Sequence, residues 1–236
     1  MKKVALVTGA AAGIGQEIAL ELARMGCTVY ANARSEEKLK DTLEKGKDLD
    51  IRPLVFDVTD YKTMEEQINT IDHIDYVVNN AGISIVGKYY DMTEAEWDIT
   101  LNTNVKGYFF VTKYALKKME RGGAIVNMSS GAAKTGGDFV SLPYSTSKGA
   151  INSLTIAFAR DLAKEGIRVN AVSPGFVDTN MLTQNGKPVE FYDTIIPLGR
   201  CGVPMDIANA VKFLLSEDAS FMTGQIIEVN GGDIMG

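Results

Sequence analysis

Short apolar runs alternate along the chain with longer helical stretches. The runs have the length and composition of buried strands, and they lie at residues 4–7, 28–33, 52–56, 75–78, 123–128, 168–172 and 225–229. Helices are predicted between many of them, for example over residues 36–45, 93–119, 151–162 and 204–215. Strands that alternate with helices are typical of an α/β domain with a parallel sheet.

Composition narrows the function classes. The 236-residue chain is 45% hydrophobic without a shift in composition, so we expect a single domain over 1–236. A net charge of −6 lacks the basic patch that nucleic acid binding needs. Cys27, Cys201 and the only histidine, His73, form no cluster, so we expect no disulfide or metal site and a cytoplasmic location. No apolar run is long enough for a signal peptide or a membrane span.

A glycine-rich turn follows the first strand directly. It runs from Thr8 to Gly15 and leads into an amphipathic helix that ends near Met25. Glycines allow a tight turn and a close approach to a pyrophosphate, which the helix N-terminus attracts. The spacing Gly-x-x-x-Gly-x-Gly differs from the G-x-G-x-x-G fingerprint, although the physical requirements are the same. The cofactor contacts predicted in this turn are Gly9, Ala12, Gly13, Ile14 and Gly15.

The end of the second strand predicts the choice of cofactor. An acidic residue there would bind a free ribose 2′-hydroxyl, whereas Arg34 and Ser35 offer a cation and a hydroxyl to a 2′-phosphate. NADP(H) is therefore favoured, and NAD(H) stays an alternative if Arg34 only caps a surface turn. Asp57 and Val58, after the third strand, are predicted at the adenine edge.

Three further polar positions point to the same crevice. Asn80, Ala81 and Gly82 form a small polar turn after the fourth strand, where the chain must turn beside a ligand. Asn104 interrupts an apolar helical pattern, and it either bends the helix to hold a water or the Lys148 ammonium, or marks an ordinary capped break. Ser130 follows the fifth strand and can donate to a substrate carbonyl oxygen.

Tyr144 and Lys148 stand four residues apart at the start of a predicted helix, so their side chains share one face. A phenol is a poor acid or base at neutral pH, but a nearby cation favours the phenolate and lowers the phenol pKa. Tyr144 is therefore the candidate proton donor, although an isolated pair of this spacing also occurs by chance.

A segment at about 178–201 has weak periodicity, prolines and glycines, and is predicted to cover the crevice. Its apolar side chains and those just before it, Phe176 and Met181 among them, either line the substrate site or pack as ordinary core. Both readings stay open from the sequence alone.

Taken together, these motifs resemble the short-chain dehydrogenase/reductase family, and most closely its 3-oxoacyl-carrier-protein reductases. The matching positions are Thr8-Gly9 with Gly13 and Gly15, Asn79-Asn80-Ala81-Gly82, Asn104, Ser130, Tyr144 with Lys148, and Pro174-Gly175. The resemblance implies a doubly wound, Rossmann-like domain with a seven-stranded parallel sheet, and further cofactor contacts at Pro174, Gly175, Val177, Thr179, Tyr144 and Lys148.

The resemblance also implies a catalytic tetrad. Ser130 would polarise the carbonyl, Tyr144 would transfer the proton, Lys148 would lower the Tyr144 pKa and bind the ribose, and Asn104 would hold a water. Substrate contacts are then expected at Ser130, Tyr144, Phe176 and Met181.

Three features of the sequence depart from the reductase pattern: two residue types and one spacing. Glu165 replaces a basic residue that could meet an acidic carrier protein, although Arg121 keeps a place similar to the other docking arginine. The separation of Ser130 and Tyr144 is one residue longer than is common. Ala12 stands where many NADP(H)-dependent members have arginine, so the phosphate preference depends on Arg34.

The leading hypothesis is an NADP(H)-dependent reductase of a ketone or 3-oxoacyl thioester. The alternatives are an NAD(H)-dependent secondary alcohol or hydroxyacid dehydrogenase and, more remotely, a non-catalytic nucleotide-binding regulator, which would be expected to have lost part of the tetrad. Apolar positions on the helices over 104–119 and 151–162 favour a homotetramer, or otherwise a homodimer.

Overall fold

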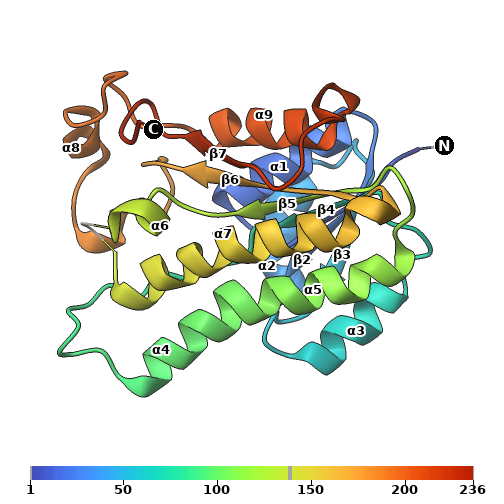
Figure 1. Ribbon diagram of the computed structural model, residues 1–236, viewed down its shortest axis with the longest axis horizontal. Coiled ribbons are helices and arrows are strands. Elements are labelled where there is room, and N and C mark those ends of the chain that lie inside the picture. The colour runs from blue at the N-terminus through green and yellow to red at the C-terminus, as the bar shows by residue number, and fades with distance from the viewer. Residues whose placement is uncertain (1, 138–139, 236) are drawn as a thin grey trace.

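The computed structural model describes residues 2–137 and 140–235. Within them, seven parallel strands form one sheet in the order β3-β2-β1-β4-β5-β6-β7 (Figure 1). The strands are β1 (Val4–Val7), β2 (Thr28–Ala33), β3 (Ile51–Val55), β4 (Tyr76–Asn79), β5 (Ala124–Met128), β6 (Arg168–Pro174) and β7 (Ile226–Val229). This confirms the predicted fold class.

Helices cover both faces of the sheet (Figure 1). One face packs on α1 (Gly13–Arg24), α2 (Glu36–Lys45) and α9 (Pro204–Leu215) through a cluster that includes Ile18 and Ile207. The other packs on α3 (Tyr61–Asn69), α5 (Gly107–Ala115) and α7 (Leu142–Leu162) through a cluster that includes Met64 and Val111. Burial on both faces explains why the strands read as continuous apolar runs.

The remaining elements are short or continue a longer helix. A π-helical turn (Asn102–Lys106) joins α4 (Glu94–Leu101) to α5, which continues as the 3₁₀ turn Leu116–Lys118. The others are α6 (Ala132–Thr135), α8 (Val189–Asp193) and the 3₁₀ turns Ala163–Glu165, Leu182–Asn185 and Glu217–Ala219. No helix in the described part of the chain is long and apolar enough to cross a membrane.

Most predicted elements agree with the structure to within a few residues. The strand at 28–33 and the helices at 36–45 and 204–215 have the predicted limits. The break near Asn104 is a π-helical turn, so the helix continues through it rather than stopping. The predicted loop 131–143 contains α6, and α7 begins before Tyr144 because Pro143 suits a first helical turn.

The strand order sets the position of the crevice. From β1 the chain adds strands in one direction to β3, and from β4 it adds them in the opposite direction to β7. The direction therefore reverses between β1 and β4, which are neighbours in the sheet. In doubly wound sheets, ligands bind outside the carboxyl ends of the strands at such a switch point. The turns after β1, β4, β5 and β6 all leave the sheet at this edge, and they carry most of the candidate site residues.

Candidate active site

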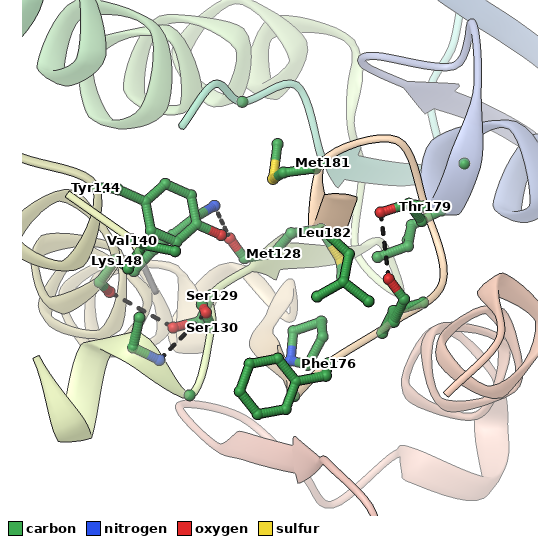
Figure 2. Close-up of a pocket in the computed structure, with 18 of the residues that line it drawn as sticks. Met128, Ser129, Ser130, Val140, Tyr144, Lys148, Phe176, Thr179, Met181 and Leu182 are labelled. Atoms are coloured by element: carbon green, nitrogen blue, oxygen red, sulfur yellow. Dashed lines mark hydrogen bonds between the residues drawn. The ribbon is translucent and has the colours of Figure 1, made fainter. Parts of the chain in front are cut away.

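A cavity of about 890 Å³ opens at the carboxyl edge of the sheet. Figure 2 shows Tyr144, Lys148 and Ser130 together on one side and Phe176, Met181 and Leu182 across from them. Most of the predicted site residues line this cavity: Gly9, Ala12, Gly13, Ile14, Gly15, Asn80, Ala81, Gly82, Ser130, Tyr144, Lys148, Pro174, Gly175, Phe176, Val177, Thr179 and Met181.

The glycine turn has the shape of a phosphate cradle. Gly9 and Gly13 adopt positive φ angles of 65° and 58°, and a Cβ atom on Gly9 would lie 2.8 Å from the Ala81 Cα. A Cβ atom on Gly15 would collide with the Gly9 carbonyl oxygen and the Asn80 side chain. Ala12 precedes α1 and supplies no side-chain cap, so the first N–H groups of the helix face the cavity without one. These groups fit the pyrophosphate of a dinucleotide.

Asn80 holds the glycine turn in place. Its amide nitrogen donates to the carbonyl oxygens of Thr8 at 2.9 Å and Gly9 at 3.1 Å. The Thr8 hydroxyl in turn accepts from the backbone N–H groups of Asn80 and Ala81. The ends of β1 and β4 are therefore cross-linked directly beneath the cavity.

Four of the predicted cofactor contacts lie outside the cavity wall: Arg34, Ser35, Asp57 and Val58. Arg34 is exposed at the end of β2, and Ser35 precedes α2 without capping it through its hydroxyl. Among the interactions of the described residues, no ion pair or hydrogen bond involves the Arg34 guanidinium. The Asp57 carboxylate accepts from the Thr59 backbone and hydroxyl, so it braces its own turn.

Lys148 and Tyr144 are both buried at the cavity floor. The Lys148 ammonium donates to the Met128 carbonyl oxygen at 2.7 Å, and it lies 5.5 Å from the centroid of the Tyr144 ring. Burial lowers the pKa of Lys148 to about 7. The shared helix face predicted from the spacing of the two residues is therefore present.

The predicted pKa of Tyr144 needs a correction. Burial raises the pKa of the phenol, and its hydrogen bond with the Ser130 side chain lowers it by less. Lys148 is not among the causes, because its ammonium is turned to the Met128 carbonyl and is itself desolvated. In this state the phenol keeps its proton, as a proton donor must.

Asn104 does not contact Lys148, contrary to one of the two predicted uses. Its side-chain oxygen accepts from the Ile83 N–H at 2.9 Å. Its nitrogen donates to the Ile83 carbonyl at 2.9 Å and to the Ser147 hydroxyl at 3.0 Å. The π-helical turn places this amide between the loop after β4 and the catalytic helix, so Asn104 ties the two together.

Both interpretations of the cover segment are partly correct. Phe176 lines the cavity, and its ring also packs 4.7 Å from that of Tyr192, which belongs to a small core with Ile196 and Cys201. Thr179 crosses to the glycine turn, because a Cβ atom on Gly13 would lie 3.3 Å from its side chain. The segment therefore bridges the cavity from the substrate side to the cofactor side.

Sequence reasoning missed several lining residues. Thr135 and Val140 come from the predicted loop 131–143, Ile195 from the predicted cover segment, and Asp233 and Ile234 from near the end of the chain. The pair Gly231-Gly232, which has positive φ angles, is the one signal that the chain turns back toward the site after β7. The Met128 carbonyl could not be found from a side-chain pattern.

Comparison with known proteins gives a consistent result. Residues 9–233 match the family model described as Enoyl-(Acyl carrier protein) reductase. The chain is 40% identical to the 3-oxoacyl-[acyl-carrier-protein] reductase FabG of Aquifex aeolicus, over 98% of this chain and 96% of that protein. It is 42% identical to the FabG protein of Staphylococcus aureus, over 100% and 99% of the two chains.

A solved structure shows the same fold. The actinorhodin polyketide ketoreductase, crystallised as a variant with NADPH, superposes with a TM-score of 0.91 and 32% sequence identity, covering 98% of this chain and 97% of that one. Both comparisons agree with the motifs and with the strand order. The resemblance predicted from the sequence is confirmed, and the chain belongs to the short-chain dehydrogenase/reductase family of oxidoreductases.

Proposed function

We propose that the protein is an NADP(H)-dependent reductase of ketones or 3-oxoacyl thioesters. The observation that carries the proposal is the convergence of Ser130, Tyr144 and Lys148 on one cavity with the glycine turn. Relatives named as 3-oxoacyl-[acyl-carrier-protein] reductases, and a structural neighbour crystallised with NADPH, support the same activity.

The dinucleotide, when bound, supplies the hydride that reduces the carbonyl carbon. The chain's own residues act on the carbonyl oxygen. The Ser130 hydroxyl orients and polarises it by a hydrogen bond, and the Tyr144 phenol gives it a proton as negative charge develops there. The Lys148 ammonium stabilises the phenolate that remains.

Asn104 acts as a positioning residue in this scheme. Both ends of its amide are bonded to Ile83 and Ser147, so it fixes the loop after β4 against the helix that carries Tyr144. A water held by Asn104 for proton relay, as the resemblance implies, stays a prediction, because the side-chain nitrogen already donates to Ile83 and Ser147.

NADP(H) is favoured by the exposed cation at the end of β2. Arg34 has no acidic partner among the described residues, and the Ser35 hydroxyl beside it is not used as a helix cap. A 2′-phosphate would receive a charge-assisted hydrogen bond from the guanidinium and a second one from the hydroxyl. Asp57, whose carboxylate braces its own turn, and Val58, which is buried in the core, remain predictions for the adenine edge.

The substrate side of the cavity is mainly apolar. Phe176, Met181, Leu182, Ile195 and Ile234 line it, which suits a hydrocarbon arm next to the reacting carbonyl. Lys148 is the only lysine or arginine among the described lining residues. A free carboxylate far from the carbonyl would therefore find no basic partner there.

The test is a panel of substrates, in which the absorbance of NADPH or NADH measures the rate of cofactor consumption or formation. It contains simple ketones, 3-oxoacyl thioesters, secondary alcohols and, because of the family model's description, an enoyl thioester. We expect NADPH-dependent reduction of at least one ketone or 3-oxoacyl thioester. Turnover only with the enoyl thioester, or oxidation of an alcohol with a preference for NAD, would refute the proposal.

We also propose a homotetramer. Phe109 on α5 and Ile156 on α7, the two helices of the prediction, each expose a large apolar side chain. Exposed apolar side chains of this size are often buried between subunits. Light scattering at micromolar concentration should give a multiple of the 25.5 kDa chain mass, and a monomer mass would contradict this.

A cytoplasmic location is proposed for the same protein. Both cysteines, Cys27 and Cys201, are buried and free, which suits a reducing compartment. Cell fractionation with a tagged chain tests it, and recovery from the membrane or the medium would contradict it.

A further inference from the structure

Tyr108 is a buried tyrosine that the proposed reaction does not use. It lies in α5 and is 1% exposed, next to the floor of the cavity. Burying a phenol is costly unless its hydroxyl finds a partner. Among the described residues, the Tyr108 hydroxyl reaches only the Met128 carbonyl oxygen, at a long 3.5 Å. The hydroxyl is therefore weakly held.

The ring of Tyr108 lies against the Lys148 ammonium. The nitrogen is 5.4 Å from the centroid of the Tyr108 ring and 5.5 Å from that of the Tyr144 ring. Both distances lie within the range in which a cation is attracted to an aromatic face. The one hydrogen bond recorded for the ammonium among the described residues goes to Met128. Two aromatic rings and one carbonyl thus surround the charge.

The charged form of Lys148 has little other support. Burial is the only cause of its lowered pKa, so no carboxylate contributes. The titratable groups that face it are Tyr144 from its own helix and Tyr108 from α5, whereas β5 presents the Met128 carbonyl and the π-helical turn presents the neutral Asn104. On α6, Lys134 is paired with Glu228 at 3.1 Å.

We propose that Tyr108 is a positioning residue whose ring keeps the Lys148 ammonium charged at its place beside the Tyr144 ring. The effect on turnover rests on the proposed roles of Lys148 and Tyr144. The effect on the ionisation of Lys148 does not. Because the hydroxyl contact is long and the ring contact is not, the ring carries the effect.

The experiment titrates Lys148 directly. Enzyme labelled with ¹³C at the lysine Cε position is followed by NMR against pH, and the Lys148 signal is assigned by its loss in the Lys148→Arg variant. Four proteins are compared: the wild type, Tyr108→Phe, Tyr108→Leu and the control Tyr114→Leu. Tyr114 is a buried tyrosine on the same helix, and its ring faces Lys113 and Lys117 instead.

Removal of the ring should lower the pKa of Lys148. We expect Tyr108→Leu to lower it by about 0.5 to 1.5 pH units from the wild-type value. Tyr108→Phe keeps the aromatic face and should leave it nearly unchanged. Tyr114→Leu should lower the melting temperature of the protein without changing the pKa of Lys148. A pKa of Lys148 that is unchanged in Tyr108→Leu, or that falls equally in Tyr114→Leu, overturns the proposal.

Kinetics then separates this inference from the proposed function. In Tyr108→Leu, kcat should fall about three- to thirtyfold above pH 7 and recover at lower pH, in step with the NMR titration. Tyr108→Phe should restore the wild-type pH profile. If the wild type reduces no carbonyl while the NMR shift is present, the proposed function fails and the assignment of Tyr108 stands. If kcat falls equally at every pH and the NMR titration does not move, Tyr108 only fills space.

Discussion

The two walls of the cavity are built differently. The catalytic wall, formed by the end of β5 and by α7, sits on a sheet that is covered on both faces. The cover wall, formed by residues 176–202, has a small core of its own made by Tyr192, Ile196 and Cys201. The bridge between Val177 and Gly202 and the packing of Phe176 on Tyr192 close this segment on itself. The Leu198 N–H donates to the Gly231 carbonyl oxygen at 3.0 Å, which ties the segment to the chain after β7.

A row of buried hydrogen bonds between polar side chains, which we call the ladder, adds to this difference. The Asn79 amide donates to Asn127 at 2.8 Å and to Thr112 at 3.0 Å. The Asn127 amide donates to the Thr155 hydroxyl at 3.0 Å. These bonds link β4, α5, β5 and α7, and each of them fixes one element against another; the Asn79 Oδ1 atom is buried without a hydrogen-bond partner among the described residues. In the proposed function, the groups of the reaction lie on the wall with these bonds, whereas substrate contacts are expected on the cover segment.

The strongest test of the catalytic wall is Tyr144→Phe. The substitution removes the proton donor and leaves the ring packing, so turnover should fall by at least about a hundredfold. Affinity for NADPH, measured by fluorescence titration, should stay close to that of the wild type. Near-normal turnover on a confirmed substrate would show that another group supplies the proton.

Substitution of Arg34 and its neighbour Ala33 should change the cofactor preference without altering either wall of the cavity. Arg34 lies outside the cavity, and its contact with a 2′-phosphate is expected to contribute about 1.5 to 3 kcal/mol, or roughly a ten- to hundredfold preference. Replacing Ala33 with Asp and Arg34 with Ser should remove that contact and add repulsion. The ratio of kcat/KM for NADPH and NADH measures the change, and an unchanged ratio would leave Arg34 as a surface residue only.

The ladder should matter for stability more than any single contact in the cover. Asn127→Leu breaks two buried hydrogen bonds and should lower the free energy of unfolding by about 2 to 3 kcal/mol. Urea denaturation of the wild type, Asn127→Leu and the milder Thr112→Val gives the comparison. A loss below about 0.5 kcal/mol in Asn127→Leu would mean that the ladder does not hold the catalytic wall.

The smallest expected effect belongs to the cover wall. Ile196→Ala removes a buried side chain from the small core and should cost about 2 kcal/mol, the low end for such a change, because the surrounding segment can adjust. We expect the KM for the carbonyl substrate to rise while the KM for NADPH stays the same. Equal increases in both constants would mean that the two walls are coupled.

The same contrast explains what the sequence could predict. The strand Thr28–Ala33 and the helix Pro204–Leu215 could be predicted from apolar patterns and from the residues that begin and end them. In both, the local sequence pattern agrees with the burial in the core. The glycine turn and the neighbouring positions of Ser130, Tyr144 and Lys148 at the cavity could be predicted from residue types, spacing and the family resemblance, whereas their catalytic roles stay predictions. The family, the fold and the reaction class were therefore predictable.

Contacts that depend on long-range packing were not predictable. The partners of Asn104 lie on a loop and on another helix, and the position of Tyr108 beside Lys148 depends on how α5 packs on α7. The lining residues Asp233 and Ile234 reach the cavity only because the chain turns back after β7. Weak periodicity over 178–201 likewise left both interpretations of the cover open.

The most direct test of the account is an isotope experiment with the wild-type enzyme. A 3-oxoacyl thioester is incubated with NADPH that carries deuterium at the transferable position of the nicotinamide, and the product is examined by mass spectrometry. The account predicts a 3-hydroxyacyl thioester with one deuterium on the hydroxyl-bearing carbon, formed in step with NADPH consumption. An unlabelled product, or NADPH consumption without a hydroxyl product, would contradict it.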